Sequence, residues 1–293
     1  MDPFSPPPDT APTYWVHDLS PFLFQFNDQF GLRYYSLAYI VGIAVAWFLF
    51  RLYERARRSP LTAKDCEGLF FALFLGVVLG GRLGYVLFYD FANFVRAPWI
   101  VFYVWEGGMA SHGGFIGVTL AVLFTARNLK LSPLRLGDLI VTVAPPGLFL
   151  GRVANFINGE LWGKPTEVAW AVIFPHAPFD SRAPAVFVES LGLWANPRHP
   201  SQLYAAFLEG LVLTIYMQVR FWRSGPRLPA GQLAAEFFIV YAIMRIIGEV
   251  FREPDASLIL GLSRGTLYSV ITLFAGMGLL LAARQVSARP RAP

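Results

Sequence analysis

Apolar residues gather into seven long runs, and polar segments separate one run from the next. The runs are close in length to the roughly 20 residues that a helix needs to cross about 30 Å of hydrocarbon. The pattern therefore predicts an all-α polytopic membrane protein with about seven transmembrane helices. The expected spans are residues 34–52, 68–89, 113–126, 134–150, 203–221, 233–251 and 266–283.

The segments outside these runs predict a small extracytoplasmic cap. The chain opens with a Pro-rich stretch that we expect to be disordered. The aromatic residues that follow, up to Phe30, are typical of a segment lying at the membrane interface. The expected division is an N-terminal arm at 1–33, a transmembrane domain at 34–283 that includes an outer loop at 164–200, and a cytoplasmic tail at 284–293.

The composition supports this membrane assignment. Hydrophobic residues make up 55% of the chain and charged residues 15%, whereas soluble domains carry roughly 25% charged residues. The net charge of +5 is small for 293 residues, and the basic residues cluster in short loops, so we expect no nucleic-acid partner. The single cysteine, Cys66, excludes a disulfide within the chain.

The loops differ in their content of basic residues. Arginine and lysine concentrate after the first, third, fifth and seventh runs, whereas the alternate loops are poorer in both. Cytoplasmic loops of membrane proteins carry an excess of these residues. The sequence therefore predicts an N-terminus outside the cytoplasm and a C-terminus inside it.

The stretch Gly151–Gly163, GRVANFINGELWG, is too polar for a plain membrane helix. Each polar group inside a membrane needs a partner, because an unpaired one costs free energy. Two prolines, Pro145 and Pro146, come shortly before it and remove two backbone donors. A broken helix within a membrane usually lines a cavity, so we expect this stretch to face a pocket.

The sixth run carries a row of polar residues. Tyr241, Arg245, Glu249 and Arg252 are spaced four, four and three residues apart, which places them on one helical face. One hypothesis is a structural Arg245–Glu249 pair that fixes helix packing. The other is a cationic site for an anionic headgroup, in which Glu249 orients the guanidinium.

Other polar residues allow two interpretations each. Arg82 lies among glycines in the second run, where it either faces a packed interior or extends outward to the headgroups. His112, in a Gly-rich segment, suits proton transfer or a structural hydrogen bond. Ser201 is an equally good helix cap or site residue, and His17 is expected at the surface. The sequence contains no H-E-x-x-H motif and no cysteine pair that would predict a metal site.

These residues fall into motifs that resemble the prolipoprotein diacylglyceryl transferases of bacteria. The similarity spans most of the chain, and the motifs occur in the family's order. The matching motifs are G-G-R-L-G-Y at Gly80–Tyr85, H-G-G at His112–Gly114, G-R-x-x-N-F-I-N-G-E-x-x-G at Gly151–Gly163, H-P-S-Q-L-Y at His199–Tyr204 and R-I-I-x-E-x-F-R-E-P-D at Arg245–Asp255. The chain departs from the family at Ala205, where the family commonly has Glu.

The resemblance implies a seven-span enzyme of the bacterial inner membrane. It implies transfer of a diacylglyceryl group from phosphatidylglycerol to the lipobox cysteine of a prolipoprotein signal peptide, with release of glycerol 1-phosphate. The nucleophilic sulfur then belongs to the substrate, which agrees with the lack of a plausible nucleophilic cysteine in this chain. The expected partners are phosphatidylglycerol, prolipoproteins and membrane lipids, and no cofactor or metal is expected.

The resemblance also assigns roles to individual residues. Arg152 and Arg245 are expected to stabilise the charge that develops on the leaving phosphate, because guanidinium groups bind phosphate bidentately. His112 is the candidate base for the thiol. The remaining headgroup and pocket residues are expected to be Tyr35, Arg82, Asn155, Asn158, Glu160, Gly163, Tyr241 and Glu249.

Two alternatives to an enzyme are open at this stage. A transporter or channel for an anionic substrate also uses broken helices and buried arginines, although two inverted halves are not visible here. A non-catalytic scaffold that binds anionic lipid is the second. Formation of a thioether product distinguishes the enzyme from both.

Overall fold

The computed structural model describes residues 14–26, 31–103, 108–224, 227–254 and 256–288. Within these ranges the chain is mainly helical, as the apolar runs predicted. The Pro-rich stretch at 1–13, Asp255 and the end of the predicted tail lie outside the described residues. The longer helices are α1 (Tyr34–Arg55), α2 (Ala63–Tyr89), α4 (Ser111–Asn128), α5 (Pro133–Val143), α6 (Pro145–Ile157), α8 (Leu213–Ser224), α9 (Gln232–Glu249) and α10 (Arg264–Ala288).

Four helical segments in the described part of the chain are long and apolar enough to cross a membrane. These are α1, α2, most of α10 and the continuous segment Ser201–Ser224, which joins α7 (Ser201–Ala205), the π-helix η3 (Ala206–Val212) and α8. The pair α5 and α6 forms a fifth candidate. Helix α9 carries Glu236, Arg245 and Glu249, and α4 has polar ends, so neither is a plain apolar span.

The two adjacent prolines explain the break between α5 and α6. The two helices are bent by 43° at Ala144, and Pro145 and Pro146 occupy the first turn of α6, where a proline removes no helical hydrogen bond. The fourth span was expected to end at residue 150, but α6 continues to Ile157. The first half of Gly151–Gly163 is therefore helical, and only its second half is irregular.

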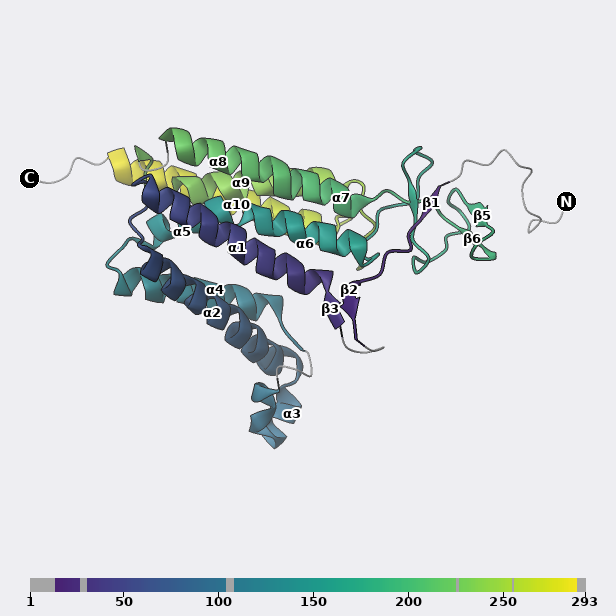
Figure 1. Cartoon of the computed structure of the whole chain (residues 1–293), viewed down its shortest axis with the longest axis horizontal. Coiled ribbons are helices and arrows are strands. Elements are labelled where there is room, and N and C mark those ends of the chain that lie inside the picture. The colour runs from purple at the N-terminus through teal and green to yellow at the C-terminus, as the bar shows by residue number, and fades with distance from the viewer. Residues whose placement is uncertain (1–13, 27–30, 104–107, 225–226, 255, 289–293) are drawn as a thin grey trace, which may run out of the picture.

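The helices form a bundle from which one hairpin diverges (Figure 1). Helices α1, α6, α8, α9 and α10 lie along one another, whereas α2 and α4 pair closely and lead away toward α3 (Phe91–Arg96) and the short helix η1 (Pro98–Phe102). Glycines allow this pairing, because a Cβ added at Gly117 of α4 would lie 1.9 Å from the carbonyl oxygen of Gly76 in α2. The α2–α4 hairpin is thus held by close backbone contact.

The described strands are short and gather largely at the end of the bundle opposite the C-terminus (Figure 1). Strand β1 (Trp15–Val16) pairs in parallel with β4 (Val172–Ile173), and β5 (Val186–Val188) pairs antiparallel with β6 (Leu193–Ala195). A further hairpin, β2 (Phe22–Gln25) with β3 (Gly31–Arg33), leads into α1. The N-terminal arm and the loop 164–200 therefore share a sheet.

The expectation that His17 lies at the surface was wrong. Its side chain is 7% exposed, and its Nε2 lies 2.7 Å from the carbonyl oxygen of Phe156 at the end of α6. The ring also packs against Phe174 of the loop. His17, in the N-terminal arm, therefore contacts both the loop 164–200 and the stretch Gly151–Gly163.

An apolar core lies within the helical bundle. Phe50 and Tyr53 of α1 pack with Leu69 of α2 and Phe221 of α8. Cys66, near the start of α2, belongs to the same cluster and is 1% exposed. The core therefore holds the helices together at the end of the bundle where α1 ends and α2 begins.

Candidate active site

The stretch Gly151–Gly163 changes from helix to tight turn after Ile157. Gly159 has φ +64°, and a Cβ there would lie 3.0 Å from the ring of His17, so both backbone angle and space favour glycine. Leu161 also has a positive φ, of 58°, which is uncommon for a bulky residue and is typical of functional segments. This turn folds Glu160 back along α6.

Three of the predicted site residues meet in one hydrogen-bond network. The amide nitrogen Nδ2 of Asn155 donates to Glu160 Oε1 at 2.8 Å and also contacts the Tyr35 hydroxyl. That hydroxyl in turn donates to Glu160 Oε1. Tyr35 comes from the first turn of α1 and Asn155 from α6, so the network fixes the end of one helix against the other.

The two arginines converge on a residue that the sequence analysis missed. Arg152 Nη2 lies 2.9 Å from Glu209 Oε2, and Arg245 Nη1 lies 3.0 Å from Glu209 Oε1. Arg245 Nη2 also pairs with Glu249 Oε2 at 3.0 Å. Both arginines were expected to act on the same phosphate. The structure joins them through a shared carboxylate, and both line one narrow cavity together with Asn155.

One signal in the sequence was sufficient to find Glu209. It is an acidic residue in the middle of an otherwise apolar run, and ionisable residues inside a span mark functional sites by default. Its partners were not predictable, because they depend on how α6, η3 and α9 pack. Tyr241, also predicted as a pocket residue, lies within interaction range of Arg152, Glu209 and Arg245.

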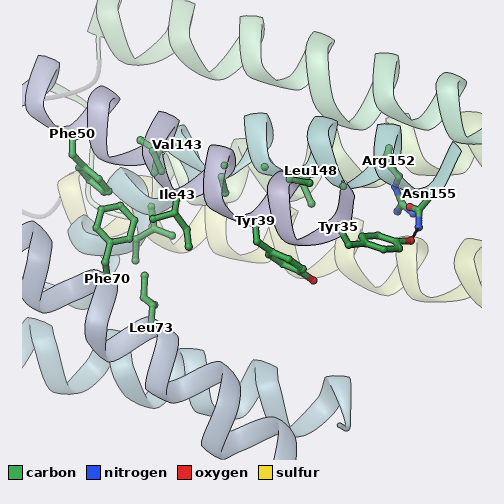
Figure 2. Close-up of a pocket in the computed structure, with 17 residues that line it drawn as sticks. Tyr35, Tyr39, Ile43, Phe50, Phe70, Leu73, Val143, Leu148, Arg152 and Asn155 are labelled. Atoms are coloured by element: carbon green, nitrogen blue, oxygen red, sulfur yellow. Dashed lines mark hydrogen bonds between the residues drawn. The ribbon is translucent and has the colours of Figure 1, made fainter. Parts of the chain in front are cut away.

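An elongated apolar cavity of about 550 Å³ extends from this cluster along the bundle (Figure 2). Arg152, Asn155 and Tyr35 lie at one end of the labelled residues, and Phe50 and Phe70 lie toward the other. Helices α1, α2, α5 and α6 supply the walls. The cavity is therefore polar at one end and apolar along its length, as an amphipathic ligand requires.

Gly163 closes the stretch by a close backbone contact. Its N–H donates to the carbonyl oxygen of His199 at 3.0 Å, and it forms a β-bridge with Arg252. A Cβ at this position would lie 2.5 Å from the His199 carbonyl oxygen and 2.7 Å from that of Phe251. The carbonyl of Gly163 accepts from the buried Arg198, a second residue that the sequence analysis missed.

Three predicted site residues lie apart from the arginines. His112 is exposed in the first turn of α4, in the hairpin that diverges from the bundle, and lines neither cavity at Arg152. Arg82 is buried and donates to the carbonyl oxygens of Ile100 and Gly108, so it does not extend outward. Asn158 caps α6, and its side-chain oxygen is buried.

Burial shifts the pKa values of two groups outside the helices. It raises the pKa of the Glu160 carboxyl above its ordinary value, because a buried carboxylate loses hydration. It lowers the pKa of His199, and the positive charge of Lys164 lowers it further. Among the described residues, no group of three or more His, Cys, Asp or Glu side chains is placed to hold a metal ion.

Comparison with known proteins decides the family. The model of the prolipoprotein diacylglyceryl transferase family matches residues 21–282. The chain belongs to this family. Its relatives include the phosphatidylglycerol–prolipoprotein diacylglyceryl transferases of Ruegeria pomeroyi, 42% identical over 92% of this chain and 97% of the relative, and of Erythrobacter litoralis, 43% identical over 97% of each chain. The resemblance of the motifs to the prolipoprotein diacylglyceryl transferases is thereby confirmed.

Proposed function

We propose that this protein transfers the diacylglyceryl group of phosphatidylglycerol to the lipobox cysteine of a prolipoprotein. The names of its relatives supply the substrates and the class of reaction. The single observation that carries the proposal is Arg152 at the polar end of a long apolar cavity, with Arg245 beside it on the shared Glu209 carboxylate. A phospholipid has the matching division into an anionic headgroup and apolar chains.

In the proposed reaction the substrate's thiol loses its proton to a base, and the sulfur attacks the carbon of the diacylated glycerol that bears the phosphate. A carbon–sulfur bond forms, the carbon–oxygen bond to phosphate breaks, and glycerol 1-phosphate leaves with the electron pair. Negative charge therefore develops on the phosphate oxygen. Arg152 and Arg245 stabilise that charge, since fixed guanidinium groups in a water-poor site need no reorganisation.

The surrounding residues have supporting roles in this proposal. Glu249 holds Arg245 through their ion pair, while Tyr35, Asn155 and Glu160 form a polar surface beside Arg152 that suits the hydroxyls of the glycerol headgroup. Tyr241 is a further proposed contact in the pocket, and Gly163 allows the close backbone approach of His199 and Phe251. Arg82 and Asn158, which were expected in the pocket, lie apart from the arginines and have no headgroup contact in this proposal.

His112 is the proposed base for the thiol. It is exposed at the start of α4, so it is open to a peptide that approaches from outside the bundle. The test is replacement by Gln: we expect turnover to fall most at neutral pH and to recover as rising pH ionises the thiol without help. A mutant that stays slow at high pH would contradict proton abstraction by His112.

The proposed location is the bacterial inner membrane, with seven spans. α4 and α9 complete the set in addition to the five candidate spans. The charged residues of α9 pair with other protein groups, and the polar residues of α4 lie mainly at its two ends. The proposed orientation places the N-terminus and the cap outside and the C-terminus in the cytoplasm, which follows from the basic loops.

A reconstituted assay tests the function. Purified protein is incubated with phosphatidylglycerol and a lipobox peptide, and mass spectrometry follows the gain of a diacylglyceryl group on the cysteine. We expect Arg152→Lys and Arg245→Lys each to lower kcat by about 100-fold, because lysine cannot bind phosphate bidentately. No product with the wild-type protein overturns the function, and full activity in both variants overturns the bidentate role.

A further inference from the structure

Glu209 is the most completely buried charged residue at the candidate site. Its side chain is 0% exposed, whereas those of Arg152 and Arg245 are 20% and 13% exposed. One carboxylate oxygen contacts each arginine, at 2.9 Å and 3.0 Å. Glu209 therefore connects two helices, α6 and α9, to a third segment, and it lies behind the guanidinium groups rather than in the opening of the cavity.

The backbone around Glu209 is unusual. It lies within η3, a seven-residue π-helix in the middle of an otherwise α-helical segment. π-Helical turns are rare and occur frequently at functional sites. The next residue, Gly210, packs against α6 so closely that a Cβ would lie 2.5 Å from Phe149 Cα. The widened turn thus faces α6 directly, on the side where Arg152 lies.

Arg152 and Arg245 already have carboxylate partners before any substrate binds, and Arg252 lines the same narrow cavity. Two guanidinium groups meet two carboxylates, Glu209 and Glu249. The contacts to Glu209 use one terminal nitrogen of each arginine, and a guanidinium has five N–H donors in all. Each arginine can therefore stay fixed by Glu209 while other donors bind an anionic oxygen.

We propose that Glu209 is a positioning residue for the transfer reaction, which sets the separation and direction of Arg152 and Arg245. This inference rests on the proposed function. Without the shared carboxylate, two positive groups would face one another with no common counter-ion and would move apart. The electrostatic stabilisation of the leaving phosphate depends on groups held in place in advance, so it falls when they move.

The inference predicts an unequal effect on kcat and KM. We expect Glu209→Gln to lower kcat by about 100-fold, comparable to the loss of one fixed donor in other enzymes. We expect the KM for phosphatidylglycerol to stay the same or to fall, because the cluster becomes more positive and still attracts the anionic headgroup. A purely structural role predicts fewer folded molecules with unchanged kcat per folded molecule.

Glu236→Gln is the matched control. Glu236 of α9 pairs with Arg220 of α8 at 2.6 Å, so this variant also removes one carboxylate from an interhelical ion pair, away from the arginine cluster. Both variants are measured in the lipobox-peptide assay beside the wild type, with the melting temperature in detergent as the measure of folding. We expect the control to lose stability and to keep wild-type kcat.

Glu209→Asp provides a second variant in case Glu209→Gln does not fold. It keeps the charge but is one methylene shorter, so it cannot reach both arginines, and we expect a kcat at least tenfold below wild type. Wild-type kcat in Glu209→Asp, or a kcat in Glu209→Gln equal to that of Glu236→Gln, overturns the positioning role. An inactive wild-type protein instead overturns the proposed function, which separates the two failures.

Discussion

Gly163 lies where the end of the Gly151–Gly163 stretch meets two other segments. A Cβ there would collide with the carbonyl oxygens of His199 and Phe251, both backbone atoms with little freedom to move. We predict that Gly163→Ala lowers the free energy of unfolding by about 1–3 kcal/mol, as overpacking does elsewhere, and lowers activity with it. Thermal melting in detergent and the lipobox-peptide assay measure the two effects.

Gly151 provides the control for this prediction. It belongs to the same stretch, but it lies inside α6, and nothing is within 4 Å of an added Cβ. Alanine favours a helix over glycine by roughly 0.5–1 kcal/mol, so Gly151→Ala should melt at the wild-type temperature or slightly above it. An equal drop in melting temperature in the two variants would contradict the claim that a side chain does not fit at position 163.

The lowered pKa of His199 predicts that the folded protein loses stability in acid. Burial and Lys164 lower its pKa in the folded protein, so the folded chain takes up a proton less readily than the unfolded one. Above the ordinary histidine pKa of about 6.5 the group is neutral in both states and has no effect on stability. As the pH falls below this value, stability is lost until the lowered pKa is passed.

Replacement by Gln should remove this acid sensitivity. We expect the drop in melting temperature between pH 7.5 and pH 5.5 (both values about one unit from the ordinary pKa) to be smaller in His199→Gln than in the wild type. His176→Gln, at an exposed position of the same loop, should melt as the wild type does at both values. An identical drop in wild type and His199→Gln would contradict the assignment.

At the scale of the element, the α2–α4 hairpin depends on contact between glycines. Gly117 of α4 lies against Gly76 of α2 with no room for a Cβ, whereas a Cβ at Gly114 meets nothing within 4 Å. We predict that Gly117→Ala separates the helices and lowers the free energy of unfolding by about 1–3 kcal/mol, and that Gly114→Ala does not. Melting curves of the two variants in the same detergent distinguish them.

Sequence patterns located the helices because each one follows an apolar run, and Pro145 and Pro146 marked the break before α6. They misplaced the end of α6, because Asn155 and the glycines around it look unfavourable for a helix until their partners are known. The sequence analysis named Tyr35, Asn155 and Glu160, which the structure brings together. It missed Glu209, although an acidic residue in an apolar run marks a candidate site; the pairing of Glu209 with both arginines depends on how the helices pack and leaves no pattern in the sequence.

For the whole molecule, the proposed orientation makes a labelling prediction. The cap and the basic loop after α1 lie at opposite ends of the bundle (Figure 1), so Ser181 and Ala56, both exposed, should face opposite sides of the membrane. In a Cys66→Ala background, we expect Ser181→Cys to react with an impermeant maleimide in intact spheroplasts. Ala56→Cys should react only after lysis, and the reverse pattern would contradict the orientation.

The burial of Cys66 has a chemical consequence for the proposed reaction. A protein that alkylates thiols with lipid carries a hazard in any thiol of its own, since one exposed near the donor would compete with the incoming peptide. Here the Cys66 sulfur is buried in the core between α1, α2 and α8, and Cys66 does not line the cavity. The packing that holds these helices together thereby also protects the protein from becoming its own substrate.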